Sequence, residues 1–179
     1  MPDNLLLGPD AQCRFSLQVL KAHQGHGSIG EHSEVIPGVF FSNDPTSKVR
    51  GNYDTSEGKM LSFQLAPRSA QKPAWQALHF AMGAADFSET SVLGVVVRST
   101  APSSTTTKLC LRSGRDNRFE DKFFRKTIVS FSEPSTHIDV LELYSASDIP
   151  KIAEWREIIF FFRPGEVSMD FLDIRIFAV

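Results

Sequence analysis

Cysteine is scarce in this chain: the 179 residues include only two, Cys13 and Cys110. Two cysteines are too few for a disulfide framework, and a chain of this length does not need one. Whether they pair stays open, because nothing in the sequence places their segments side by side. No segment approaches the roughly 20 apolar residues of a membrane span, so we expect no membrane partner.

A secretory signal is also missing, because the N-terminal MPDNLLLG has neither a basic region nor a long apolar stretch. We therefore expect a cytoplasmic protein, or a secreted one if a leader has been removed. The net charge of -2 and the pI near 6.2 give no field that would recruit nucleic acid. The locally basic segment 112–126 contains three acids and indicates a mixed-charge surface.

What the sequence does contain is a series of short strand-like runs. With 41% hydrophobic residues, one core over residues 1–179 is expected. Sustained helical periodicity is absent, and we expect at most one or two short helices, with 147–155 as the candidate. The pattern favours an all-β antiparallel sandwich or barrel. The expected strands are 14–20, 60–65, 76–82, 92–98, 107–112, 122–131, 137–143 and a terminal pair.

The terminal pair consists of an apolar run at 158–162, a Pro-Gly turn and an alternating strand to the C-terminus. Side chains of a strand alternate between two faces. The alternation predicts Leu172, Ile174 and Ile176 on the core face. The residues predicted on the other face are Phe171, Asp173, Arg175 and Phe177. So apolar a terminal strand must be paired inside a sheet, because an exposed edge would aggregate.

Residues 22–59 look different and are expected to be a long, loop-rich early region. Gly25 to Gly30 match G-x-G-x-x-G, but Pro37 follows too soon for the helix that a dinucleotide site needs. Three histidines in this region, His23, His26 and His32, are candidates for a transition-metal site. A metal-dependent enzyme using them is one alternative function.

Aromatic and polar residues on the expected strands form the better candidate site. A sugar ring presents an apolar face of C–H groups, which stacks on an aromatic ring, and hydroxyls that hydrogen-bond to polar side chains. Tyr144 and Trp155 are further platforms, although Trp155 also fits a core position. The candidate ligand-binding residues are His79, Arg98, Arg112, Arg175, Trp75 and Tyr53.

Phenylalanine-rich strands suggest another alternative. Phe123, Phe124 and Phe131 in one strand, and Phe160 to Phe162 in another, fall on both faces of their strands. A sheet that is apolar on both faces usually has a second partner. A protein-interaction module, with the chain as a homo-oligomer, is therefore a second candidate function.

The order of these elements resembles a known family. It runs from Trp75-x-x-Leu78-His79-Phe80 through the valine-rich strand 92–98 and Leu-Cys-Leu-Arg at 109–112 to the strands 155–162 and 172–176. This order is similar to the galactose-binding-like jelly rolls that include many carbohydrate-binding modules. The resemblance implies a jelly-roll β-sandwich and covers about residues 60–179.

The resemblance also implies a function, namely a non-catalytic module whose partner is a glycan or small sugar. The family often has a structural calcium near the chain termini and no other cofactor. Asp10, Asp170 and Asp173 are the candidate calcium ligands here, although no dense Asp/Asn/Gly loop is present. Fold analogy alone does not establish the function.

Overall fold

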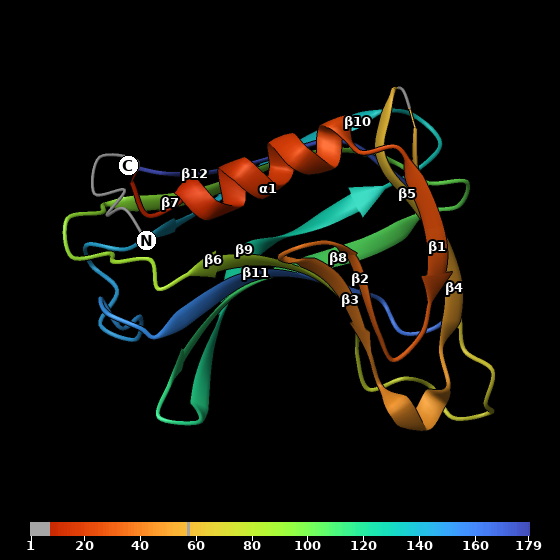
Figure 1. Cartoon of the computed structure of the whole chain (residues 1–179), viewed down its shortest axis with the longest axis horizontal. Helices are drawn as coiled ribbons and strands as arrows, with labels where there is room; N and C mark the ends of the chain where they lie inside the picture. The colour runs from red at the N-terminus through yellow and green to blue at the C-terminus, as the bar shows by residue number, and fades with distance from the viewer. Residues whose placement is uncertain (1–7, 57) are drawn as a thin grey trace.

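The structure is a computed structural model that describes residues 8–56 and 58–179. The described residues form two antiparallel sheets of six strands each, packed face to face as a sandwich (Figure 1). Sheet A contains, in spatial order, β1 (Gly25–Ile29), β4 (Arg50–Ser56), β5 (Lys59–Ala66), β12 (Val167–Ala178), β7 (Val92–Thr100) and β10 (Ser135–Glu142). Sheet B contains β2 (His32–Ile36), β3 (Val39–Asn43), β6 (Gln76–Gly83), β11 (Trp155–Phe162), β8 (Thr105–Arg115) and β9 (Arg118–Ser130). The all-β antiparallel sandwich expected from the sequence is confirmed.

The core lies between the two sheets and is built by strand alternation. Phe41, Phe80 and Phe160 of sheet B meet Phe63 and Phe171 of sheet A, all buried. Their rings pack in tilted and edge-to-face pairs, with centroids 5.4 Å apart for Phe80 and Phe160. Such aromatic pairs add about 1 kcal/mol beyond the burial of their area. The core therefore holds the two sheets in a fixed relation.

Three expectations about local structure were wrong. Residues 14–20 do not form a strand but belong to α1 (Ala11–Ala22), which buries Cys13, Leu17 and Leu20 on one face. The spacing of these three residues is that of an amphipathic helix. Residues 147–155 form no helix, and the segment 22–59 carries four strands, β1 to β4, and the 3-10 helix η1 (Pro45–Ser47) instead of a long loop.

Helix α1 closes one side of the sandwich, as Figure 1 shows. Strand β3 pairs with β6 only as far as Phe80, and β5 pairs with β12 only as far as Phe171. The helix packs on the parts of β6 and β12 that lie beyond the ends of β3 and β5. Cys13 Sγ donates to Ala81 O at 3.3 Å, and Lys21 forms an ion pair with Asp173 at 3.4 Å. None of the helices in the described residues is long and apolar enough to cross a membrane.

The face assignment of the last strand was partly wrong. Between Phe171 and Asp173 the pairing of β12 with β7 shifts by one residue at Leu172, a β-bulge. Before the bulge Phe171 points into the core, and after it Ile174 and Ile176 do. The expected core positions Ile174 and Ile176 are confirmed, whereas Leu172 is only partly buried. Phe171, expected on the opposite face, is fully buried in the core, because it precedes the bulge.

Sheet B is strongly curved, and its concave side faces away from sheet A (Figure 1). At the two ends of this arch lie the β2–β3 pair and the β8–β9 hairpin. The hairpin turns at Asp116 and Asn117, both with positive φ as in the tight turns of β-hairpins. The curvature gives sheet B a concave outer surface (Figure 1).

Both cysteines are free thiols in buried positions. Burial raises the pKa of Cys13 far above its ordinary value, with the Asp10 charge adding to the effect. Burial also raises the pKa of Cys110, to about 12. Because the thiolate is the reactive form, we expect neither thiol to react with Ellman's reagent at pH 8 in the native protein, and both to react in denaturant. Rapid reaction of one thiol equivalent in the native protein would contradict this.

Candidate functional site

The concave face of sheet B carries the strongest cluster of ligand-type side chains. Strand register places Phe40, His79, Ile159, Cys110 and Phe123 opposite one another in a single row across five strands. The same register places Trp155 toward one end of the strands, while Trp75 precedes β6 at the other end. We call this surface, from Trp75 to Trp155 with the row between them, the concave face.

Trp155 lies flat on the floor of the concave face. It stands opposite Gly114 of β8, and a Cβ atom at position 114 would lie only 1.9 Å from Trp155 Cε2. Only a glycine therefore lets the indole lie across the neighbouring strand. The side chain keeps 37% exposure, so the ring is supported from below and accessible to a ligand.

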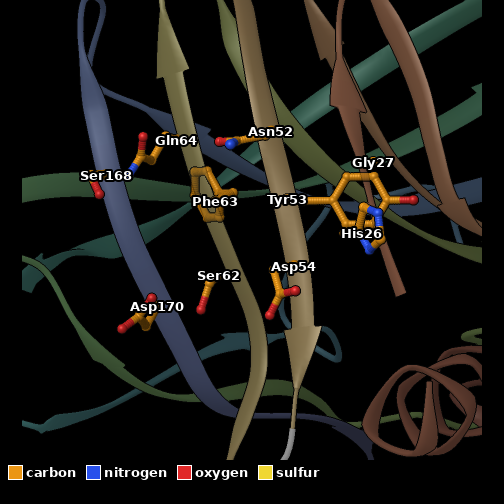
Figure 2. Close-up of a pocket in the computed structure, with 10 residues that line it drawn as sticks. All are labelled: His26, Gly27, Asn52, Tyr53, Asp54, Ser62, Phe63, Gln64, Ser168 and Asp170. Carbon is orange, nitrogen blue, oxygen red and sulfur yellow. The ribbon is translucent and has the colours of Figure 1, made fainter. Parts of the chain in front are cut away.

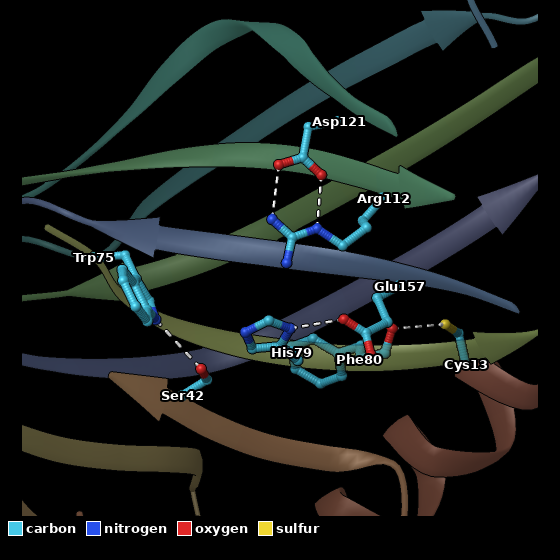
Figure 3. Close-up of polar contacts among 8 residues, drawn as sticks. All are labelled: Cys13, Ser42, Trp75, His79, Phe80, Arg112, Asp121 and Glu157. Carbon is cyan, nitrogen blue, oxygen red and sulfur yellow. Dashed lines mark hydrogen bonds and ion pairs between the residues drawn. The ribbon is translucent and has the colours of Figure 1, made fainter. Parts of the chain in front are cut away.

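Trp75 lies at the opposite end of the strands, just before β6. Its indole Nε1–H donates to Ser42 Oγ at 3.3 Å (Figure 3), and the residue is 39% exposed. The chain contains two tryptophans in total, and both belong to this one face. The fold therefore places one tryptophan at each end of the concave face.

Two pairs of hydrogen-bonded polar side chains lie on the concave face (Figure 3). His79 Nδ1 and Glu157 Oε2 are 2.8 Å apart, and Arg112 forms a bidentate pair with Asp121 through Nε and Nη2, both at 2.7 Å. Glu157, Arg112 and Asp121 are direct neighbours across three strands. The floor thus alternates anion, cation and anion, and the pairing leaves Nη1 of Arg112 outside the Asp121 contact.

Arg112 is fixed from a second direction by an aromatic ring. Its guanidinium carbon lies 4.0 Å from the centroid of Phe119, a cation–π distance. The hydrogen bonds with Asp121 raise the pKa of Arg112 above its ordinary value. The guanidinium is therefore a permanently charged group of fixed orientation, and Phe119, 55% exposed, extends the aromatic surface.

His79 is held in the sheet and not presented to solvent. The residue is 5% exposed, and its ring stacks on Phe40 with centroids 4.6 Å apart and an interplanar angle of 11°. Nε2 is buried without a hydrogen-bond partner among the described residues. The imidazole therefore fixes Glu157 and Phe40 on the floor of the concave face.

The structure divides the residues expected from the sequence between two surfaces. His79, Arg112 and Trp75 share the concave face, whereas Arg98 and Arg175 lie on the outer side of sheet A. Arg175 Nε donates to Asp173 Oδ2 at 2.9 Å. The sequence reasoning thus identified suitable residue types but not the sheet that carries them.

Tyr53 lies beside a different, polar hollow of about 340 Å³ on sheet A (Figure 2). Its ring crosses Gly27 of the neighbouring strand and packs against the core. The side chains that line the hollow are mostly amides, hydroxyls and carboxylates from β4, β5 and β12, such as Asn52, Gln64 and Asp170. This hollow lacks an exposed aromatic ring face like that of Trp155, so it is the weaker candidate for stacking a sugar.

The residues expected to hold metals do not form a group. No cluster of three or more His, Cys, Asp or Glu residues in 8–56 and 58–179 is placed to bind a metal ion. His23 contacts Thr55 Oγ1 at 2.9 Å, whereas His26 lies on β1 and His32 on β2, in different sheets.

The three carboxylates considered for calcium are engaged elsewhere. Asp10 pairs with Arg14 at 3.1 Å, Asp170 pairs with Lys59 at 2.8 Å, and Asp173 is shared between Lys21 and Arg175. Each of these carboxylates thus already contacts a positively charged side chain, which would compete with a calcium ion for the carboxylate oxygens. These residues do not fit a calcium site in the structure.

Several residues of the concave face were not in the expected set. Trp155 was considered as a platform and set aside as a core residue, and Glu157, Asp121 and Phe119 were not considered as ligands. Phe123, 47% exposed, and Phe161 pack together on this face with centroids 5.7 Å apart. No alternation pattern identifies Trp155 as a platform, because its support is Gly114 of β8, and the register of β8 with β11 is seen only in the structure.

Solved structures similar to this fold include several carbohydrate-binding modules. No protein-family model matches the chain, and no curated protein does. The family 22 xylan-binding domain of Paenibacillus barcinonensis Xyn10C aligns over 87% of this chain and 96% of its own, with 8% identity and a TM-score of 0.51. A family 4 module aligns over 84% and 95%, with 10% identity and a TM-score of 0.57.

A third structure, the family 11 module of Clostridium thermocellum, contains a β-1,3-1,4-mixed-linked tetrasaccharide. It aligns over 86% of this chain and 96% of its own, with 11% identity and a TM-score of 0.51. At such low identity these likenesses establish the fold alone. The chain has the jelly-roll fold of carbohydrate-binding modules, as the resemblance in its sequence suggested.

Proposed function

We propose that this protein is a carbohydrate-binding module whose concave face holds a glycan chain. The observation that carries the proposal is the flat, solvent-accessible indole of Trp155 on Gly114. A flat aromatic ring supported from below is the surface on which the C–H face of a pyranose stacks. The similar folds of a xylan-binding domain and of a module bound to a tetrasaccharide support the same function.

The polar groups of the concave face suit the hydroxyls of the sugar. Glu157 and Asp121 supply acceptor oxygens beside Arg112, which retains a donor in Nη1. A chain crossing the sheet from β3 to β9 passes four inter-strand steps of about 4.8 Å each. The resulting path of roughly 19 Å accommodates a short oligosaccharide.

The ligand we propose is a neutral glycan. The guanidinium of Arg112 is already paired with Asp121, and its next neighbour across the sheet is the carboxylate of Glu157. An acidic sugar would have to displace Asp121 from a bidentate pair, which is among the stronger contacts between side chains. We also propose that the module is not catalytic, since the imidazole of His79 is buried, stacks on Phe40 and has Glu157 as its hydrogen-bond partner.

Affinity electrophoresis tests this function. The protein is run through native gels that contain xylan, mixed-linkage β-glucan, galactomannan, pectin or alginate, beside Trp155→Ala as the matched variant. We expect at least one neutral polysaccharide to retard the wild type, with little retardation of the variant and none by pectin or alginate. Equal mobility of the wild type in all gels would refute the proposal.

A further inference from the structure

Trp75 lies at the end of a long connection between β3 and β6 of sheet B, which runs through β4 and β5 of sheet A. The contact of its side chain with Ser42 is a single hydrogen bond at 3.3 Å. A half-exposed indole held in this way would sample several orientations unless its backbone were fixed. The contacts of the backbone therefore decide where the platform lies.

The backbone at Trp75 is held by Asp44, the first residue after β3. Asp44 N–H donates to Trp75 O at 3.0 Å, and Ala74 N–H donates to Asp44 Oδ2 at 2.7 Å. One residue thus makes two bonds, in opposite directions, to the two residues that place the indole. These bonds join the two ends of the connection across 30 residues.

The same carboxylate caps η1. Its Oδ1 accepts hydrogen bonds from Thr46 N at 2.9 Å and from Thr46 Oγ1 at 2.7 Å. Asp44 is 4% exposed and forms no ion pair within the described residues, so amide and hydroxyl donors alone stabilise its charge. These bonds, with that from Ala74 the strongest, lower the pKa of Asp44 below its ordinary value.

A cap for η1 requires only the two bonds from Thr46. The bond from Ala74 adds nothing to that cap, because Ala74 lies outside η1 and beside Trp75. Its geometric effect is to fix the peptide that precedes the tryptophan. The two oxygens of Asp44 therefore have separable tasks, Oδ1 for the cap and Oδ2 for the platform.

We propose that Asp44 is a positioning residue of the concave face, which holds Trp75 in place through Ala74 without touching the ligand. The inference rests on the proposed function for its effect on binding, although the hold on Trp75 stands on the hydrogen bonds alone. Because Asp44 is buried, it does not contact a bound glycan. It affects binding only through the orientation of the Trp75 indole.

Asp44→Asn separates the two tasks. Asparagine caps a helix about as well as aspartate, but it offers one acceptor oxygen and an NH2 group. With its oxygen toward Thr46, the NH2 group faces the Ala74 N–H, so two donors oppose each other. The matched control is Thr46→Val, which keeps the shape of threonine, loses the hydroxyl bond to Oδ1 and leaves the Ala74 bond intact.

Both substitutions are made in a Trp155→Phe background, in which Trp75 is the remaining tryptophan and its fluorescence reports on the platform. For Asp44→Asn we expect a red-shifted emission maximum and a Trp75 acrylamide-quenching constant raised by at least 1.5-fold, roughly, with native circular dichroism. We expect Thr46→Val to show the emission and quenching of the parent. Unchanged emission and quenching in Asp44→Asn would overturn the proposal.

Binding is measured separately in the chain that keeps Trp155, with mixed-linkage β-glucan and xylan as the probes. If this chain binds either one, Asp44→Asn is expected to weaken the affinity by about 5- to 10-fold and Thr46→Val by less than 2-fold, roughly. Equal weakening by both variants would overturn the role of Asp44 in positioning. If no neutral polysaccharide of the electrophoresis panel binds this chain, the proposed function is contradicted, and the fluorescence result still decides whether Asp44 holds Trp75.

Discussion

Trp155→Ala is expected to weaken binding to the polysaccharide that retards the wild type by about 30- to 100-fold, equivalent to roughly 2–3 kcal/mol. The indole lies flat on Gly114 with one face open, so alanine removes the whole stacking surface. Trp75→Ala is expected to cost about 10-fold, because this platform lies at the rim. Isothermal titration calorimetry with a soluble oligosaccharide measures both.

The matched control is Tyr144→Ala, which removes an aromatic side chain that is 72% exposed and lies in the loop after β10. Its affinity should equal that of the wild type. If Trp155→Ala binds as tightly as Tyr144→Ala, the ligand does not stack on the concave face. A variant with normal thermal unfolding is required in each case, so that lost binding is not lost folding.

The second large effect concerns Arg156, which lies next to Trp155 and is completely buried. Its Nε donates to Ala85 O at 2.7 Å, and Nη2 donates to Pro150 O at 2.6 Å and Lys151 O at 2.9 Å. The guanidinium lies 4.1 Å from the centroid of Phe87. Burial lowers the pKa of Arg156 to about 10, so the group is still charged at neutral pH.

We expect Arg156→Met to lower the free energy of unfolding by about 3–5 kcal/mol, measured by urea denaturation. Methionine fills part of the volume but leaves the carbonyls of Ala85 and Pro150 without the donors that Arg156 supplies. Each unsatisfied group costs about 1–3 kcal/mol, whereas Lys151 O keeps its bond from Phe87 N–H. Arg156→Lys should lose less. The matched control is Arg115→Met at an exposed arginine, with an expected change below about 0.5 kcal/mol. A loss of less than about 1 kcal/mol for Arg156→Met would contradict the expected effect.

The strands of the second half of the chain could be predicted because each is a long apolar or alternating run bounded by turn residues. The early region was misjudged for two physical reasons. Strand β1 is Gly25-His-Gly-Ser-Ile29 and carries little apolar surface. Its pairing with β4 is therefore seen in the structure but is not indicated by the sequence. Residues 14–20 were read as a strand, although Cys13, Leu17 and Leu20 have helical spacing.

The bulge at Leu172 shows a limit of strand parity. Alternation was correct on either side of it, but one extra residue exchanges the faces, and a bulge has no sequence signal of its own. An alternating pattern therefore predicts which side chains face the core within a run that has no bulge, but not across a bulge.

The candidate site was half predictable. His79, Arg112 and Trp75 have the residue types that bind sugars, and the sequence pattern places them on strands. Arg98 and Arg175 have the same chemistry, yet they lie on sheet A. The order of the strands in the two sheets, and not the residue type, decides which side chains share a surface. The pairing of Trp155 with Gly114 depends on register between distant strands, which alternation alone does not give.

The most direct test of the central claim is a 15N-labelled NMR titration with an oligosaccharide from the retarding polysaccharide. The chain has two tryptophans, so its two indole Nε1–H signals belong to Trp75 and Trp155. We predict that both indole signals shift, together with amides of β6, β11 and β8, while those around Asn52 and Gln64 on sheet A stay in place. Shifts confined to the hollow on sheet A, with both indole signals unmoved, would contradict binding at the concave face.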